Sequence, residues 1–530
     1  MRALAFLLAF LAGSACAPEG GRFGKKGSLA LPSGRDSFRF GTASSSTQIE
    51  DQNRNTDWYT WTAPAPEGMG KGTSFVGEAS RGYSRALEDI ALADSLGLDS
   101  YRFSIEWARI EPSPGEYSEA ALKHYDDMLD ELVARDMTPM VTLHHYSWPR
   151  WASDPRKPCD IFNPTRDCGL ETDESYALLA ASMTRLAELL ARRFGDRVDD
   201  WYTLNEPVNY IIAGYGMGLF PPGRTHILQM AEKMMPLVRR YFDLHARLAK
   251  ALRAHDTVDA DNDGQATSIG FGLSLQEFIP AREGRPSAYQ ADIAARDRLD
   301  YVMREAPIRF MLEGGFDADL DGTLEEPHPE WTGTLDWVGV QTYFRSGVTA
   351  AVPLIPLLDL MLCFDEGSDL GLGACVQPLD ESYWVPSMKY GWGPDALYLN
   401  LRAISKRFPQ LPIVVTENGI ATLSGARRSE VIVRSFEDIM QAQDEGADIR
   451  GYFHWTLTDN FEWHLGFGPQ FGLFRVDSKD YSRIKTTGAE TLRNIATSSR
   501  VVGTSKLVRR RRAAFRRERR AVARLRRAWA

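Results

Sequence analysis

The sequence has few cysteines, no long apolar run and no net positive charge outside its last residues. Only five of its 530 residues are cysteine. The apolar run from Ala3 to Ala12 is too short to span a bilayer stably, and no later segment is long and apolar enough to be a transmembrane helix. These absences argue against a protein that is built from membrane-spanning helices.

Charge is divided unevenly along the chain. The formal net charge is −9, but residues 506–530 alone carry +11, which leaves −20 on the rest. An acidic body argues against general nucleic-acid binding. In the basic tail, six apolar residues fall near one helical face: Leu507, Ala514, Phe515, Val522, Leu525 and Trp529. This pattern suits a basic amphipathic helix on an anionic membrane or polymer, and a solvated, partly disordered tail is the alternative.

The first 17 residues have the features of an export signal. A short positive start and an apolar run lead to Ala15-Cys16-Ala17, which fits signal cleavage. Gly13-Ser14-Ala15-Cys16 also resembles a lipoprotein box, although Gly13 stands where leucine is usual. We therefore expect an exported protein, periplasmic, extracellular or anchored through a lipid on Cys16.

The remaining four cysteines form two local pairs, which supports export. Cys159 and Cys168 are nine positions apart, and Cys363 and Cys375 are twelve apart, each pair in a loop-like stretch. We predict disulfides Cys159–Cys168 and Cys363–Cys375. The alternative is four free thiols.

Apolar runs and helical patterns alternate through most of the chain. Eight runs read as buried strands: 38–43, 100–105, 138–145, 200–206, 268–275, 337–344, 413–419 and 451–459. Amphipathic stretches such as 83–96, 120–135, 174–194 and 231–255 lie between them. Eight β and α units predict an α/β protein with a single (β/α)8 barrel domain over residues 36–497. Residues 18–35 would be a leader and 498–530 the basic tail.

The longest connection runs from about Arg345 to Pro412. Its stretch 350–362 is rich in proline and leucine. A long loop on the active face of a barrel usually shapes a binding site, and a hydrophobic helix packed on the surface is the equal alternative for 350–362.

Two glutamates stand just past strand-like runs. They are Glu206, in Thr203-Leu204-Asn205-Glu206-Pro207, and Glu417, 211 positions later in Thr416-Glu417-Asn418-Gly419. A carboxylate at such a place is desolvated, so it must be hydrogen-bonded, paired or used. Two carboxylates at separate strand ends are what cleavage of a glycosidic bond needs. For either stretch alone, a helix cap or a turn would explain the glutamate as well.

Several motifs in order resemble glycoside hydrolase family 1, the β-glucosidase family. They are Phe38-Arg39-Phe40-Gly41-Thr42-Ala43 with Gln48 and Glu50, Tyr101-Arg102-Phe103-Ser104-Ile105, Thr142-Leu143-His144-His145, Asn205-Glu206-Pro207, Thr416-Glu417-Asn418-Gly419, and the run from Trp455 to Trp463. The resemblance covers about residues 36–495. It implies a retaining β-glycosidase that hydrolyses terminal β-D-glucosyl, or β-galactosyl or β-fucosyl, residues and needs no cofactor or metal.

The resemblance also implies a role for each site residue. Glu417 would be the nucleophile and Glu206 the acid/base, while Arg102 and Tyr343 would keep Glu417 ionised. Asn205 would donate to the sugar 2-hydroxyl. The other hydroxyls and the apolar face of the sugar would meet Gln48, His145, Glu462, Trp455 and Trp463.

The same residues indicate which substrates fit. Relatives that cleave thioglucosides carry glutamine where this chain has Glu206, and relatives that act on 6-phosphosugars lose the Glu462-Trp463 pair. A neutral O-glycoside is therefore favoured. Gln341 stands where the family usually has asparagine, and Thr47 where it usually has an aromatic residue, so the sugar preference stays open. An enzyme that mainly transfers sugars, and a non-catalytic sugar-binding barrel, are the alternatives.

Two aspartate-rich stretches resemble the start of calcium loops. They are Asp259-x-Asp261-x-Asp263-Gly264 and Asp317-x-Asp319-x-Asp321-Gly322. The glutamate that an EF-hand needs at position 12 is Gly270 in the first and His328 in the second. We interpret both stretches as polar turns.

Overall fold

The computed structural model describes residues 23–24, 27–29, 37–159, 166–351, 353–362, 381–499 and 501. The predicted signal segment 1–17 with Cys16, most of the leader, the Cys363–Cys375 pair and the basic tail 506–530 lie outside these residues. Within the described ranges, no helix combines the length and the apolar character that crossing a membrane requires.

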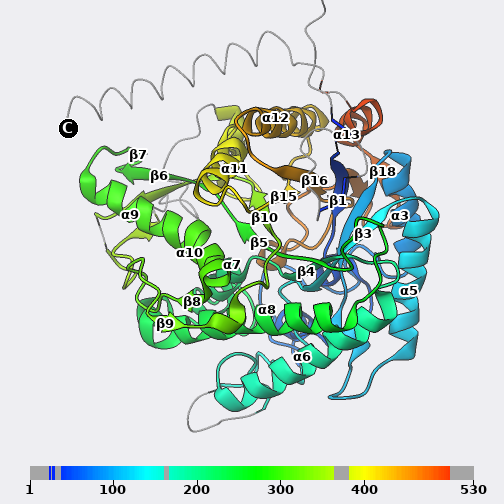
Figure 1. Ribbon diagram of the computed structural model, residues 1–530, viewed down its shortest axis with the longest axis horizontal. Helices are drawn as coiled ribbons and strands as arrows, with labels where there is room; N and C mark the ends of the chain where they lie inside the picture. The colour runs from blue at the N-terminus through cyan, green and yellow to red at the C-terminus, as the bar shows by residue number, and fades with distance from the viewer. Residues whose placement is uncertain are drawn as a thin grey trace, which may run out of the picture.

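Eight parallel strands close into a barrel in chain order, with β1 beside β16 (Figure 1). They are β1 (Arg39–Ala43), β2 (Ser100–Ser104), β3 (Thr138–His144), β4 (Asp200–Leu204), β5 (Ser268–Ser274), β10 (Trp337–Thr342), β15 (Ile413–Asn418) and β16 (Ile449–Trp455). Each begins within two residues of its predicted start. The (β/α)8 barrel that the alternating pattern predicts is confirmed.

Helices lie outside the strands and cover the barrel (Figure 1). The main ones are α3 (Ala86–Ser95), α5 (Glu119–Ala134), α6 (Asp173–Phe194), α8 (Met235–His255), α9 (Gln290–Asp300), α11 (Ala396–Arg407), α12 (Gly425–Asp444) and α13 (Thr487–Ser498). In α8, Leu237, Tyr241, Leu244 and Leu248 are buried at spacings of three or four residues, which puts them on one face. This apolar stripe holds the helix on the sheet.

A buried ion pair and part of the leader close the N-terminal end of the barrel. Arg39, the first residue of β1, pairs with Asp200, the first of β4, and its second nitrogen lies 3.0 Å from Asp261. Phe23 from the leader is buried against Phe38 and Phe40. The packed body therefore includes leader residues that precede the predicted domain boundary at residue 36.

A second, smaller sheet lies beside the barrel, in the order β13–β14–β11–β6–β7. Its strands are β6 (Glu277–Arg282), β7 (Arg285–Pro286), β11 (Arg345–Thr349), β13 (Trp384–Val385) and β14 (Tyr390–Gly391), and β12 (Met361–Leu362) adds to β11. The stretch 350–362 thus returns as an antiparallel strand after a turn bridged at Ile355 and Leu360, and the helix alternative is wrong. Its prolines 353 and 356 lack the N–H groups that a helix interior needs.

The structure joins Cys159 to Cys168 by a disulfide, with their Cα atoms 5.6 Å apart. Cys168 is buried, and its neighbour Ser153 forms an isolated β-bridge with it. The bond closes a local loop between β3 and α6, as the spacing of the two cysteines predicts.

Candidate active site

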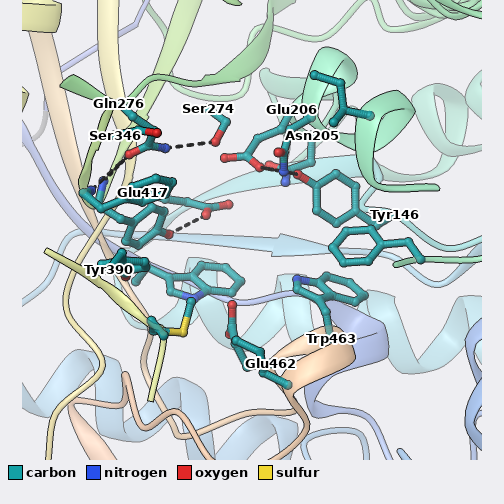
Figure 2. A pocket seen from close by; sticks show the side chains of 18 of the residues that line it. Tyr146, Asn205, Glu206, Ser274, Gln276, Ser346, Tyr390, Glu417, Glu462 and Trp463 are labelled. Carbon is teal, nitrogen blue, oxygen red and sulfur yellow. Dashed lines mark hydrogen bonds between the residues drawn. The ribbon is translucent and has the colours of Figure 1, made fainter. Parts of the chain in front are cut away.

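Both glutamates lie at the C-terminal end of the barrel, where the loops that follow the strands begin. Glu206 is the second residue after β4, and Glu417 is the last but one residue of β15. Their side chains line the same cavity and point toward it from opposite sides (Figure 2). Each is almost fully buried, with 7% and 4% of its surface exposed. The desolvated carboxylate pair that the sequence predicts is therefore present in one site.

Glu417 is bonded on both oxygens. Arg102 Nη1 from β2 lies 2.6 Å from Oε1, and the hydroxyl of Tyr343 donates to Oε2 at 2.7 Å. Arg102 is itself fully buried and rests on the ring of Tyr202, 3.9 Å from its centroid. Burial raises the pKa of Glu417, while the guanidinium and the phenol hydroxyl oppose that rise. They are the groups that hold this carboxyl as the anion.

Glu206 has a different set of partners. Within the described ranges, no arginine or lysine pairs with it, and its hydrogen-bond donors are neutral groups of Tyr146, Asn209 and Ser274. Burial and the charge of Glu417 raise the pKa of Glu206 to about 7. Of the two carboxyls, Glu206 is thus the one that keeps a proton near neutral pH.

The residues predicted to bind the sugar surround the same cavity. His145, Trp455, Glu462 and Trp463 line it, and Gln48 lies behind Glu462, with its Nε2 3.3 Å from Glu462 Oε2. The His145 ring lies roughly parallel to both indoles at 5.8 and 5.9 Å. Burial with Glu417 and Glu206 nearby raises the pKa of Glu462 to about 8.

Asn205 is held by three donors on one oxygen. Arg102 Nη2 and Gln341 Nε2 each lie 2.7 Å from Asn205 Oδ1, and the Tyr202 hydroxyl lies 3.3 Å from it. Because a guanidinium only donates, the atom that faces Arg102 must be the amide oxygen. The amide nitrogen of Asn205 is consequently left for another acceptor.

Sequence reasoning missed several residues that contact the central pair of glutamates or the side chains beside it. Tyr146, Tyr202, Asn209, Ser274 and Gln276 were not singled out, although four of them line the cavity. Three of them could have been found from their positions close to predicted site residues in the sequence. Tyr146 directly follows the predicted His145, Tyr202 lies on β4 three residues before Asn205, and Asn209 comes three residues after Glu206, one helical turn on.

Both aspartate-rich stretches form turns away from the cavity. The backbone N–H groups of Asp263 and Gly264 bond to Asp259, and those of Asp321 and Gly322 bond to Asp317. Carboxylate oxygens gather within 4.8 Å of one another in two groups, Asp199 with Asp259 and Asp261, and Asp317 with Asp319 and Glu325. No residue of either group lines the cavity of the glutamates.

Known proteins with similar sequences and folds match over nearly the whole barrel. The family model described as glycosyl hydrolase family 1 matches residues 32–500. β-Glucosidase 6 of Oryza sativa subsp. japonica is 29% identical over 500 residues, which cover 86% of this chain and 88% of that protein. A β-galactosidase of Pyrococcus woesei is 28% identical over 494 residues, covering 85% and 94%.

Among solved structures, a β-glycosidase from Pyrococcus horikoshii superposes with a TM-score of 0.69 at 27% identity. The match covers 89% of this chain and 96% of that one. Barrel topology, paired glutamates and the match over residues 32–500 agree. This chain belongs to glycosyl hydrolase family 1 and is a retaining β-glycosidase.

Proposed function

We propose that this enzyme is a β-glucosidase in which Glu417 is the nucleophile and Glu206 the acid/base. The observation that carries the assignment is the unequal bonding of the two carboxyls. Glu417 bonds to the cation of Arg102 and to the Tyr343 hydroxyl, whereas Glu206 bonds to neutral donors. This difference supports placing the anion on Glu417 and the proton on Glu206 before substrate arrives.

This difference supports both halves of a double displacement. Glu417 attacks the anomeric carbon while Glu206 gives its proton to the leaving oxygen, so that a glycosyl ester forms and the aglycone departs as a neutral alcohol. The ester carries no charge, so the repulsion that raised the pKa of Glu206 disappears. Glu206 then takes a proton from water, which attacks the same carbon and releases the sugar with its original configuration.

The cavity suits one neutral sugar ring. Trp455 and Trp463 offer apolar surfaces, and Glu462, Gln48 and His145 offer hydrogen-bonding groups beside them. Burial lowers the pKa of His145 well below its ordinary value, so its imidazole is neutral and offers one donor and one acceptor. A buried, protonated Glu462 would likewise donate to one hydroxyl and accept from another.

On the aglycone side the cavity wall is mostly apolar. Residues from η1 (Ile212–Gly216), β6, α9 and η4 (Tyr301–Glu305) meet those of the loops after β10, β13 and β16. The apolar members of the wall are Ile212, Phe220, Phe278, Leu299, Met303, Phe344, Met388 and Leu465. Such a surface favours an aryl or alkyl aglycone over a second sugar, whose hydroxyls would find few partners there.

A trapping experiment tests the assignment of the nucleophile. A β-glucoside with fluorine at C2 and a dinitrophenyl leaving group should form a stable ester, and mass spectrometry of the digested protein should place the sugar on the peptide with Glu417. A label on any other residue would overturn the assignment.

A substrate panel tests the rest of the proposal. The β-glucoside should react faster than the β-galactoside and β-fucoside, and an octyl or phenyl β-glucoside faster than cellobiose. Glu206→Gln should slow the phenyl glucoside at least 100-fold more than the dinitrophenyl glucoside, because only the phenolate needs a proton to leave. Equal losses on both substrates would remove Glu206 from the acid role.

A further inference from the structure

Two neutral donors occupy one oxygen of Glu206. The Tyr146 hydroxyl donates to Glu206 Oε2, and Asn209 Nδ2 lies 2.9 Å from the same oxygen. Asn209 Nδ2 also lies 2.9 Å from the Tyr146 hydroxyl oxygen. Because the amide nitrogen only donates, it fixes the direction of the second bond: Tyr146 accepts from Asn209 and gives its own hydrogen to Glu206.

Packing holds these donors in place. Tyr146 is 3% exposed, and its ring lies nearly parallel to that of Tyr210, with centroids 5.6 Å apart at an angle of 17°. Its other neighbours include Trp463, 5.2 Å away (Figure 2). Tyr146 comes from the loop after β3, and Asn209 from α7 (Pro207–Ile211), which begins next to Glu206. Two elements thus converge on one carboxyl oxygen.

We propose that Tyr146 and Asn209 are positioning residues that hold Oε2 of Glu206 and so confine the transferable proton to Oε1. This inference rests on Glu206 being the acid/base. An oxygen that already accepts two hydrogen bonds is a poor place for a proton, so the proton is left to Oε1, to which neither Tyr146 nor Asn209 bonds. Ser274, the third partner of Glu206, has a hydroxyl that can accept as well as donate, so it is compatible with a protonated carboxyl. The pair therefore selects which oxygen faces the glycosidic bond.

The same two donors act on the proton transfer itself. As the bond between the anomeric carbon and the leaving oxygen breaks, the proton on Oε1 moves to that oxygen and Glu206 becomes a carboxylate. Hydrogen bonds to a carboxylate are stronger than those to a neutral carboxyl, so the donors favour release of the proton. They also oppose the rise in the pKa of Glu206 that burial and Glu417 cause.

The test compares two tyrosine-to-phenylalanine variants. Tyr146→Phe removes the hydroxyl on Glu206 and keeps the ring. Tyr210→Phe is the matched control, because its hydroxyl bonds to Trp148 and does not touch Glu206. For Tyr146→Phe we expect the alkaline limb of kcat/KM on phenyl β-glucoside to move up by about one pH unit, with at least a tenfold loss of kcat/KM at pH 6. Asn209→Leu should move the limb in the same direction, and the control should keep the wild-type limb.

Two outcomes would overturn the inference. A limb that stays in place or moves down in Tyr146→Phe contradicts it, even if activity falls, because loss without a shift is what simple structural damage produces. A control that shifts equally contradicts it as well. Glu206→Gln separates this failure from failure of the proposed function: an alkaline limb that survives in that variant would show that Glu206 is not the acid at all.

Discussion

Gln341 offers a test of how the site holds the sugar, because it bonds to the side-chain oxygen of Asn205. Asn205 Oδ1 accepts from Arg102, Tyr202 and Gln341, which leaves the amide nitrogen to donate to the 2-hydroxyl of the sugar. Gln341 is fully buried, and its Oε1 has no hydrogen-bond partner among the described residues. Replacing it by methionine removes one of the three donors and keeps the volume of the side chain.

The expected cost follows from counting bonds. The bond from Gln341 to Asn205 contributes about 1 kcal/mol net, and Arg102 and Tyr202 still hold Asn205. The second bond of Gln341 Nε2, 3.0 Å from the Tyr202 hydroxyl oxygen, is lost as well but does not touch Asn205. A loss of about 1 kcal/mol lowers kcat/KM on a β-glucoside about fivefold. Asn205→Ala removes the contact to the 2-hydroxyl itself, which is worth several kcal/mol in the transition state, so a loss of 100-fold or more is expected.

The assay compares a β-glucoside with its 2-deoxy analogue, which lacks the 2-hydroxyl. Gln341→Met should slow the first substrate and leave the second within twofold of wild type. Its thermal unfolding temperature should stay close to wild type, because the substitution also removes a buried oxygen without a partner. A fivefold loss on both substrates would refute the reasoning, since it would mean that Gln341 acts through Glu417 or through the fold.

Three further expectations concern the site and its support. Gly272→Ala should lower the free energy of unfolding by about 1–3 kcal/mol and should also lower kcat/KM, because a Cβ at Gly272 would lie 1.5 Å from the Tyr202 hydroxyl oxygen. Unfolding curves and kinetics measure the two effects, and wild-type values for both would contradict the prediction. Burial raises the pKa of Glu462 to about 8, so the folded protein holds a proton there that the unfolded chain gives up above about pH 4. The contribution of Glu462 to the free energy of unfolding is therefore fully present below about pH 4 and is lost as pH rises through about 8. Between about pH 4 and pH 8 the unfolding temperature should fall in the wild type, and the fall should be smaller in Glu462→Gln by on the order of 5 °C. An equal fall in both proteins would count against this account. Cys168→Ser should lower the free energy of unfolding by about 2 kcal/mol, measured in urea, and a reductant should bring the wild type to the same value.

The barrel could be predicted because its strands are covered on both faces. Runs such as Ile413 to Val415 and Trp337 to Val340 are buried throughout, which makes a continuous apolar run that sequence shows directly. The stretch 350–362 could not be assigned the same way. Its apolar side chains pack partly against the body, and it ends as a strand because Met361 and Leu362 pair with β11.

The predicted site residues were found from motifs, and so were the bonds of Arg102 and Tyr343 to Glu417, but the contacts that hold Asn205 and Glu206 were not. Nothing in the sequence near Asn205 indicates that Gln341, 136 positions away, would bond to its oxygen. Tyr146 likewise reads as one more aromatic residue after His145. Such contacts depend on where two strand ends meet across the barrel, and sequence fixes that only through the whole fold.

The hydrogen bonds and the ion pair around Glu206 and Glu417 determine which of the two can act as the acid and which as the nucleophile. Both are buried at strand ends, so burial alone would raise the pKa of each and would not tell an acid from a nucleophile. Arg102 breaks the symmetry by bonding to Glu417, and the charge it stabilises raises the pKa of Glu206 in turn. Tyr146 and Asn209 then limit that rise with neutral donors, which keeps Glu206 able to release its proton. A cation beside Glu206 would have lowered its pKa and left it ionised, without a proton to donate. The reaction therefore depends on Arg102 being paired with Glu417 and on Glu206 having no paired cation among its described neighbours.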